Sequence, residues 1–331
     1  MAFFWTLVLG FGTGACRSLA EMRRNFESST GTHLVPSSFY DRFTPALCKF
    51  LKSAVSKACQ TLSEPGEKLG GSLAQFRDVV VADCTVIALH DLLASAYQAC
   101  RTNHTKAALK MQVVISALAA GPRAIHLLSE RGNELKKLKI GPWIKGRLLL
   151  VDLGYYHFSL FERVDRNGGL FVSRVKASSN FRIIKANRTW RGRGAEVVGK
   201  KIQDVLPKLR REVLDVNVEL RVKRRAYGDR QSTVSKTFRL VAVRNDEAKR
   251  YHLYLTNVSG DVLSAEEVAK AYAARWEVEL LFKELKSQYR LDELPSAKRH
   301  IVESLIYVAV LTLTISRLLP QALRRRNAAD R

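Results

Sequence analysis

One segment of the chain places side chains that can handle phosphate chemistry at the spacing of a single helix face. Tyr272, Arg275, Glu279 and Lys286 occur within fifteen residues. At about 100° per residue they fall within an arc of roughly 60° on one continuous helix. Such a face would present a carboxylate flanked by two cations and a phenol. The alternative is an ordinary charged face in contact with solvent.

The same segment carries the pattern that a helix needs to pack against a core. Ser264 and Glu267 predict a capping box at the start of the helix. A neighbouring apolar stripe would face the core, and it consists of Val278, Leu281, Phe282, Leu285 and Tyr289.

Two aspartates interrupt apolar runs far upstream. Asp83 follows the run 79–82, and Asp152 follows the run 148–151. An ionised carboxylate in such a run is costly unless a partner or a metal ion compensates it. We expect each aspartate to lie at the end of a buried strand, where the alternative is a turn former or a helix cap. With Glu279, the two aspartates would form a group of three carboxylates.

The pattern Tyr-x2-Arg-x3-Glu-x6-Lys, which starts at Tyr272, resembles the signature of the DDE transposases of the insertion-sequence-four family. Thr256-Asn257 and Arg275-Trp276 also resemble that family. The resemblance implies an α/β fold with an RNase H-like mixed sheet flanked by helices. It also implies a β-rich insertion between the second aspartate and the glutamate, and helical N- and C-terminal parts.

The resemblance further implies a chemistry. Asp83, Asp152 and Glu279 would be the catalytic triad and would hold two Mg²⁺ or Mn²⁺ ions. Two such ions clamp the attacking and leaving oxygens of a phosphodiester displacement. The enzyme would cleave DNA at the terminal inverted repeats of an element and join the ends to target DNA, as a homodimer in the synaptic complex. Phosphates near the scissile bond would be contacted by Tyr272, Arg275 and Lys286.

Composition agrees with a polyanionic partner. The 331 residues include 55 Lys and Arg and 31 Asp and Glu, a formal net charge of +24. The segment 182–250 contains 20 basic and 8 acidic residues, so half of the excess lies between Asp152 and Glu279. Composition alone does not separate DNA from RNA or an anionic membrane surface.

We predict four regions. Residues 1–75 form a helical N-terminal part with helices over 17–26 and 37–62, which is either a DNA reader or a structural cap. Because members of the resembled family usually have further residues ahead of this region, we expect this part to be shortened at Met1. Residues 76–178 form the first part of the core, with strands over 107–118, 123–129 and 147–153 and a helix over 133–140. Residues 179–260 form the basic insertion, and residues 261–331 complete the core.

The insertion alternates apolar and polar residues in 216–223 and parts of 237–244, and 251–256 is a third candidate strand. Trp190 in an Arg-Gly-rich loop would stack on a base or a sugar, and the alternative is an aromatic folded onto the sheet. The family's aromatic for a flipped base corresponds to Tyr251, His252 or Tyr254. Further DNA contacts are expected from Arg191, Arg193, Arg224 and Arg225.

Several classes of site find no support in the sequence. The five cysteines lack Cys-x2-Cys spacing, and no Gly-x4-Gly-Lys-Ser/Thr loop is present. The apolar run 304–315 is shorter than a bilayer span, so we expect a buried helix, no membrane contact and a cytoplasmic, nucleoid-associated protein. Two other functions remain open, a truncated or non-catalytic DNA-binding inhibitor and an RNase H-like nuclease without strand transfer.

Overall fold

The computed structural model describes residues 1–62, 69–100, 105–119, 121–176, 178–188, 196–223, 233–245 and 250–329. The chain divides into two compact units. The first unit comprises Met1–Gly66, Asp83–Glu134 and Glu277–Arg331, and the second comprises Glu67–Ala82 and Leu135–Trp276.

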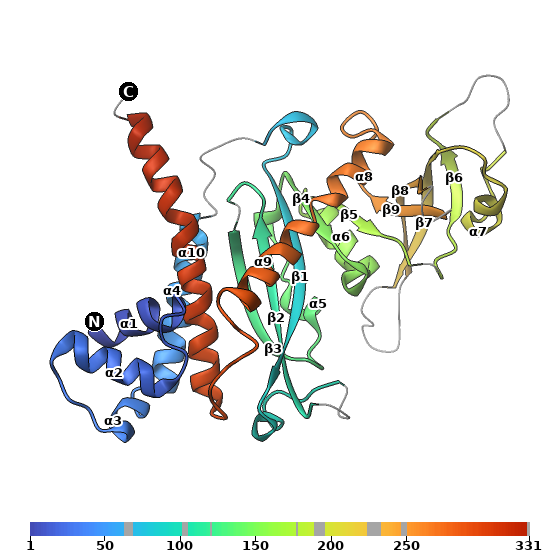
Figure 1. The fold of residues 1–331 in the computed structure, drawn as a ribbon. Coiled ribbons are helices and arrows are strands. Elements are labelled where there is room, and N and C mark those ends of the chain that lie inside the picture. The colour runs from blue at the N-terminus through green and yellow to red at the C-terminus, as the bar shows by residue number, and fades with distance from the viewer. Residues whose placement is uncertain are drawn as a thin grey trace. The chain divides into compact units, whose positions relative to one another are not determined.

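The fold is mixed α/β. In the described part of the chain, nine strands form one sheet in the order β3-β2-β1-β4-β5-β9-β8-β7-β6 (Figure 1). The strands are β1 (Asp78–Leu89), β2 (Ala107–Ser116), β3 (Gly121–Ser129), β4 (Arg147–Val151), β5 (Leu170–Arg174), β6 (Arg182–Ala186), β7 (Val213–Lys223), β8 (Thr233–Asn245) and β9 (Arg250–Thr256).

Parallel and antiparallel pairing divide the sheet. Strand β4 pairs in parallel with both β1 and β5, whereas β2 and β3 pair antiparallel. All five residues of β4 and the first five of β1 are buried, which is typical of parallel strands covered on both faces. The predicted strands of the basic region are present, but they do not form a separate sheet. Antiparallel pairing of β9 with β5 makes them an extension of the same sheet.

Helices build most of the first unit. They are α1 (Ala2–Thr6), α2 (Leu19–Thr30), α3 (Pro36–Tyr40), α4 (Pro45–Leu62), α9 (Trp276–Ser287) and α10 (Arg299–Ala329). The predicted single helix over 37–62 is wrong, because the chain turns after Tyr40 and restarts at Pro45. Proline lacks an N–H and is favoured at the first turn of a helix, where that donor is not needed.

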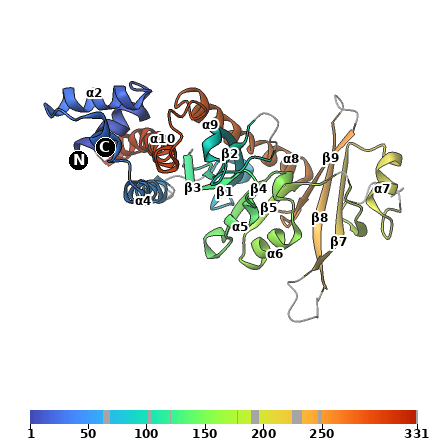
Figure 2. The same cartoon turned by 90° about the horizontal axis from the view of Figure 1, so that it is seen from below.

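The C-terminal helix α10 packs along α4 (Figures 1 and 2). The predicted buried segment 304–315 lies within it, but the expected length was wrong. The apolar part, Arg299–Pro320, is 22 residues and is long enough to cross a membrane by length and composition. Most of its apolar window is buried inside the protein, so the core of the first unit accounts for its hydrophobicity. Gly12 permits a close approach here, because a Cβ atom would lie 2.1 Å from Thr312 Oγ1.

The second unit carries α6 (Phe158–Arg166), α7 (Ile202–Val205) and α8 (Ala265–Ala273), and α5 (Glu134–Lys137) begins at its boundary. A buried ion pair joins two of its strands. Arg239 on β8 donates from Nε and Nη2 to the two carboxylate oxygens of Asp215 on β7, at 2.9 and 2.6 Å. Its Nη1 donates to the carbonyls of Val258 and Leu263. The guanidinium thereby fixes the loop that leads into α8 against the sheet.

Candidate active site

The first candidate carboxylate follows the last paired residue of a parallel ladder. The register of β1 and β4 runs from Asp78 opposite Arg147 to Ala82 opposite Val151. Asp83 is the next residue of β1, is half-buried, and its Oδ1 accepts the N–H of Cys84 at 2.7 Å. The expectation that Asp83 ends its strand is wrong. β1 continues to Leu89 because it has a second neighbour, β2, on its other side.

The second candidate carboxylate ends its strand as predicted. Asp152 follows the last residue of β4 and begins a single turn of 3-10 helix, in which the N–H of Tyr155 donates to the Asp152 carbonyl. The Asp152 side chain is half-buried. Among the described residues, no Lys or Arg lies within ion-pair distance of its carboxylate.

Tyr272 lies beside Asp152 within the second unit. Its hydroxyl donates to the carbonyl of Val151 at 3.4 Å, and its ring contacts that of Tyr254 at a centroid distance of 5.3 Å. Burial and then the negative charge of Asp152 raise the pKa of the Tyr272 phenol. The structure thus places Tyr272 in the interior, against the residue that precedes the aspartate.

The predicted single helix through the four signature residues is wrong. Helix α8 ends at Ala273 and α9 begins at Trp276. In the intervening turn, the N–H groups of Ala274 and Arg275 donate to carbonyls three residues back, at 3.1 and 3.0 Å. These bonds replace the four-residue bonds of an α-helix. A constant 100° step therefore does not connect Tyr272 with the residues of α9.

Within α9 the predicted faces are present. Glu279 and Lys286 are seven residues apart, which leaves them about 20° apart around the helix axis. The apolar face is buried, with Val278 and Leu285 fully enclosed. Lys286 Nζ donates to the carbonyl of Val86 on β1 at 2.9 Å. The capping box is also confirmed, since Ser264 and Glu267 bond each other's N–H groups at the start of α8.

The remaining cation of the signature lies at the turn. The Arg275 guanidinium carbon lies 5.9 Å from the centroid of the Tyr272 ring. This distance permits a cation–π contact, so Arg275 and Tyr272 are neighbours even though the helix is broken between them.

The three carboxylates are divided between the two units. Asp83 and Glu279 belong to the first unit and Asp152 to the second. Over the ranges that the structure describes, no group of three His, Cys, Asp or Glu side chains is close enough to hold a metal ion.

Five predicted DNA-binding residues lie outside the described residues, and they are Trp190, Arg191, Arg193, Arg224 and Arg225. Of the three candidate aromatics on β9, Tyr251 donates its hydroxyl to the carbonyls of Leu209 and Arg211, and Tyr254 is buried.

Sequence reasoning missed Arg174, the last residue of β5. Its guanidinium carbon lies 5.9 Å from the centroid of the Tyr254 ring. Its Nε is buried without a hydrogen-bond partner among the described residues. The signal was a charged residue at the end of the buried run Phe171–Ser173, the same pattern that pointed to Asp152.

The comparisons with known proteins find transposases. Residues 74–315 match the family model described as "Transposase DDE domain". The transposase of insertion sequence IS1151 from Clostridium perfringens is 20% identical over 335 residues, which covers 92% of this chain and 71% of the relative. The transposase of IS231E from Bacillus thuringiensis subsp. finitimus is 23% identical over 337 residues, covering 90% and 68%. A piggyBac transposase in a synaptic complex with hairpin DNA aligns with a TM-score of 0.44 at 11% identity, covering 95% of this chain and 64% of that one.

Proposed function

The chain belongs to the transposase DDE domain family, and we propose that Asp83, Asp152 and Glu279 are the carboxylates with which it cleaves DNA. It is an insertion-sequence transposase, an enzyme that cuts DNA and transfers strands, and its resemblance to the insertion-sequence-four family is confirmed. The identity of its site residues is our proposal.

The register of β1 and β4 carries the assignment of the two aspartates. Ala82 pairs with Val151 at the end of the parallel ladder. The residue that follows each of them is an aspartate. Carboxylates that share one site repel each other unless a cation compensates their charge. The pairing therefore supports a shared cation-binding role better than two independent turn-forming roles.

The contact between α9 and β1 supports Glu279 as the third carboxylate. Lys286 Nζ bonds the carbonyl of Val86 within the first unit. Glu279 lies seven residues before Lys286, about 10.5 Å along the helix. Asp83 lies three residues before Val86, about 10 Å along the strand. Since α9 and β1 run in the same general direction (Figure 1), Glu279 and Asp83 would lie at the same level.

The donor set fits a hard divalent cation. All three residues offer carboxylate oxygens, the ligands that Mg²⁺ and Mn²⁺ prefer, and Asp152 is half-buried without an ion-pair partner among the described residues. When bound, two such ions would polarise the scissile phosphate and activate the attacking hydroxyl. Tyr272 would hold the backbone before Asp152, and Lys286 would hold α9 on β1.

The order β3-β2-β1-β4-β5 supports an RNase H-like core, and β6 to β9 would be the basic insertion. The substrates would be the element's terminal inverted repeats and target DNA, bound by a homodimer. The net charge of +24 supports this partner, and the cytoplasm is the expected setting.

The test removes one carboxylate at a time while keeping its shape. Asp83→Asn, Asp152→Asn and Glu279→Gln should each reduce Mg²⁺-dependent cleavage of an inverted-repeat duplex to background. Duplex binding, measured by gel shift, should remain near wild type because the basic surface is unchanged. Asp292→Asn, an exposed carboxylate of the first unit, is the matched control and should cleave normally. Full cleavage by any of the three variants would remove that residue from the proposed triad.

A pre-cleaved end tests the second step separately. When the pre-cleaved end is incubated with target DNA and Mg²⁺, the wild-type protein should join this end to the target. EDTA should stop the joining, and added Mn²⁺ should restore it. Cleavage without any joining would identify a nuclease.

A further inference from the structure

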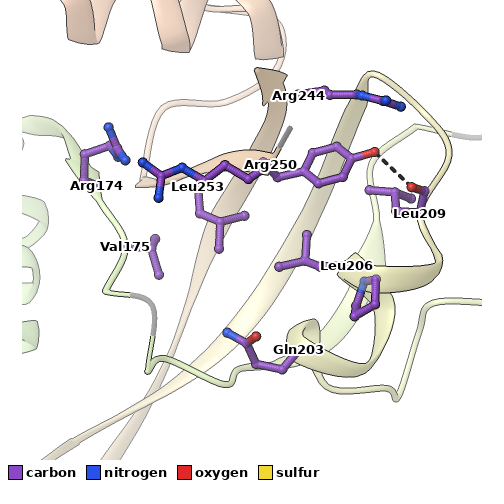
Figure 3. A pocket seen from close by; sticks show the side chains of 10 residues that line it. Arg174, Val175, Gln203, Leu206, Leu209, Arg244, Arg250 and Leu253 are labelled. Atoms are coloured by element: carbon purple, nitrogen blue, oxygen red, sulfur yellow. Dashed lines mark hydrogen bonds between the residues drawn. The ribbon is translucent and has the colours of Figure 1, made fainter. Parts of the chain in front are cut away.

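A cavity of about 510 Å³ lies within the second unit, away from the carboxylates (Figure 3). It opens between β9, the end of β5 and the segment around α7. Ten described residues line it, three of them arginines and none of them acidic. They are Arg174, Val175, Gln203, Leu206, Pro207, Leu209, Arg244, Arg250, Tyr251 and Leu253.

The arginines come from three separate positions in the sheet. Arg174 ends β5, Arg250 begins β9, and Arg244 lies opposite Tyr251 in the register of β8 and β9. In Figure 3 the side chains of Arg174 and Arg250 lie close to one another, and Arg244 lies farther away, on the Leu209 side. Burial, and then the charges of Arg174 and Arg250, lower the pKa of the neighbouring His252. Both guanidinium groups therefore act on the same small volume.

One of these donors is unsatisfied. Arg174 Nε is buried and has no hydrogen-bond partner among the described residues. A buried donor without an acceptor carries an uncompensated desolvation cost, and gathered positive charges add repulsion. An anion in the cavity would relieve both costs.

The opposite wall is apolar and fixed. Leu206, Pro207 and Leu253 contribute hydrocarbon surface. The Tyr251 hydroxyl donates to the carbonyls of Leu209 and Arg211, so its ring is held as a rigid wall. The N–H of Val175 donates to the carbonyl of Leu253 at 3.0 Å, which ties the β5 side of the cavity to β9.

We infer that this cavity binds the phosphate group of a nucleotide, with the guanidinium groups on the phosphate and the apolar wall against the attached sugar. Guanidinium groups bind phosphate oxygens through paired donors. The volume lies within the range of pockets that hold a small ligand and exceeds what a bare anion needs. The phosphate belongs either to the backbone of bound DNA or to a free nucleotide. Only the DNA source rests on the proposed transposase function.

The test compares two pairs of arginines. Arg174→Ala/Arg250→Ala removes two of the three guanidinium groups that line the cavity. Arg182→Ala/Arg221→Ala removes two exposed arginines of the same unit that do not line it. Titration calorimetry with deoxythymidine monophosphate should show a dissociation constant raised roughly tenfold or more by the first pair and little changed by the second. Thymidine, which lacks the phosphate, should not bind.

The salt dependence of duplex binding separates the two sources. If the cavity holds a backbone phosphate, the slope of log affinity against log salt should fall by about 0.9 for the lost contact in Arg174→Ala/Arg250→Ala. A normal slope together with weakened mononucleotide binding identifies a free-nucleotide site. Equal mononucleotide binding and equal slopes in the wild type and this variant would overturn the inference.

A double lysine variant distinguishes the loss of phosphate binding from misfolding. Arg174→Lys/Arg250→Lys keeps the charges and most of each stem but loses the paired donors. Its mononucleotide affinity should lie between those of the wild type and the alanine pair, with an unchanged thermal unfolding midpoint. The failure of the proposed function is distinguishable, because Asp83→Asn should bind the mononucleotide normally. A protein that binds it but never cleaves DNA would retain this site and lose the transposase mechanism.

Discussion

At the scale of single residues, Tyr272 illustrates how a signature position acquires a role from its surroundings. The sequence suggested that its phenol contacts a DNA phosphate, but the side chain is buried and donates to the carbonyl of Val151. Asp152 follows that carbonyl directly. We therefore assign Tyr272 a positioning role, in which it fixes the end of β4 and with it the aspartate.

Tyr272→Phe tests this role. The change removes one buried hydroxyl and keeps the ring against Tyr254, so it should lower the free energy of unfolding by about 1 kcal/mol. Tyr272→Ala should cost about 3–5 kcal/mol because it also leaves a cavity. Urea unfolding measures both. Unchanged stability in Tyr272→Phe with abolished cleavage would instead support a direct phosphate contact.

At the scale of elements, the turn between α8 and α9 separates two docking interactions. Helix α8 begins at a capping box and follows the loop held by Arg239, and α9 is attached to β1 through Lys286. Each helix can thus place its own signature residue against its own unit.

Lys286→Met tests the docking of α9. Methionine keeps an unbranched apolar stem and loses the donor to the Val86 carbonyl, so Glu279 should be held less precisely. We expect cleavage to slow by about tenfold or more without a change in the salt slope of DNA binding. Lys270→Ala, an exposed cation on α8, should cleave normally. A reduced salt slope in Lys286→Met would show that this amine contacts DNA phosphate.

Ser264→Ala tests the start of α8. The serine accepts the N–H of Glu267 at 3.2 Å, and loss of such a cap typically costs about 1 kcal/mol. Ser53→Ala lies at an exposed interior position of α4, where alanine is the better helix former. It should be neutral or slightly stabilising in the same urea unfolding measurement. Equal effects of the two changes would contradict the capping role.

At the scale of the whole molecule, buried phenols make stability sensitive to alkaline pH. In the described ranges, burial raises the pKa of Tyr97, Tyr156, Tyr254, Tyr272, Tyr289 and Tyr307. An unfolded tyrosine loses its proton near pH 10, where the folded protein still keeps these protons. The folded state then binds more protons, so the free energy of unfolding should fall as pH rises through this value.

Tyr156→Phe isolates one contribution to this effect. Burial raises the pKa of Tyr156 to about 12, so the unfolded phenol ionises about two pH units before the folded one. The decline of the urea midpoint between about pH 10 and 12 should be shallower in Tyr156→Phe than in the wild type. An identical decline would exclude Tyr156 as a contributor.

The sequence by itself determined the local features. The signature spacing indicated the family, the apolar runs located β1, β2, β3 and β4, and Ser264 with Glu267 marked the start of α8, because these patterns depend on residues close together in the chain. The tertiary structure decided what distant segments do to one another. It placed the turn at Ala274–Arg275 and buried Tyr272 against β4.

The tertiary structure also gathered Arg174, Arg244 and Arg250 around one cavity. Sheet pairing joined β5, β8 and β9 across gaps of up to about eighty residues. The local periodicity of apolar residues does not indicate which strands pair or which side chains then line the same cavity. Pairing depends on long-range packing and register, and these arise only when the chain folds.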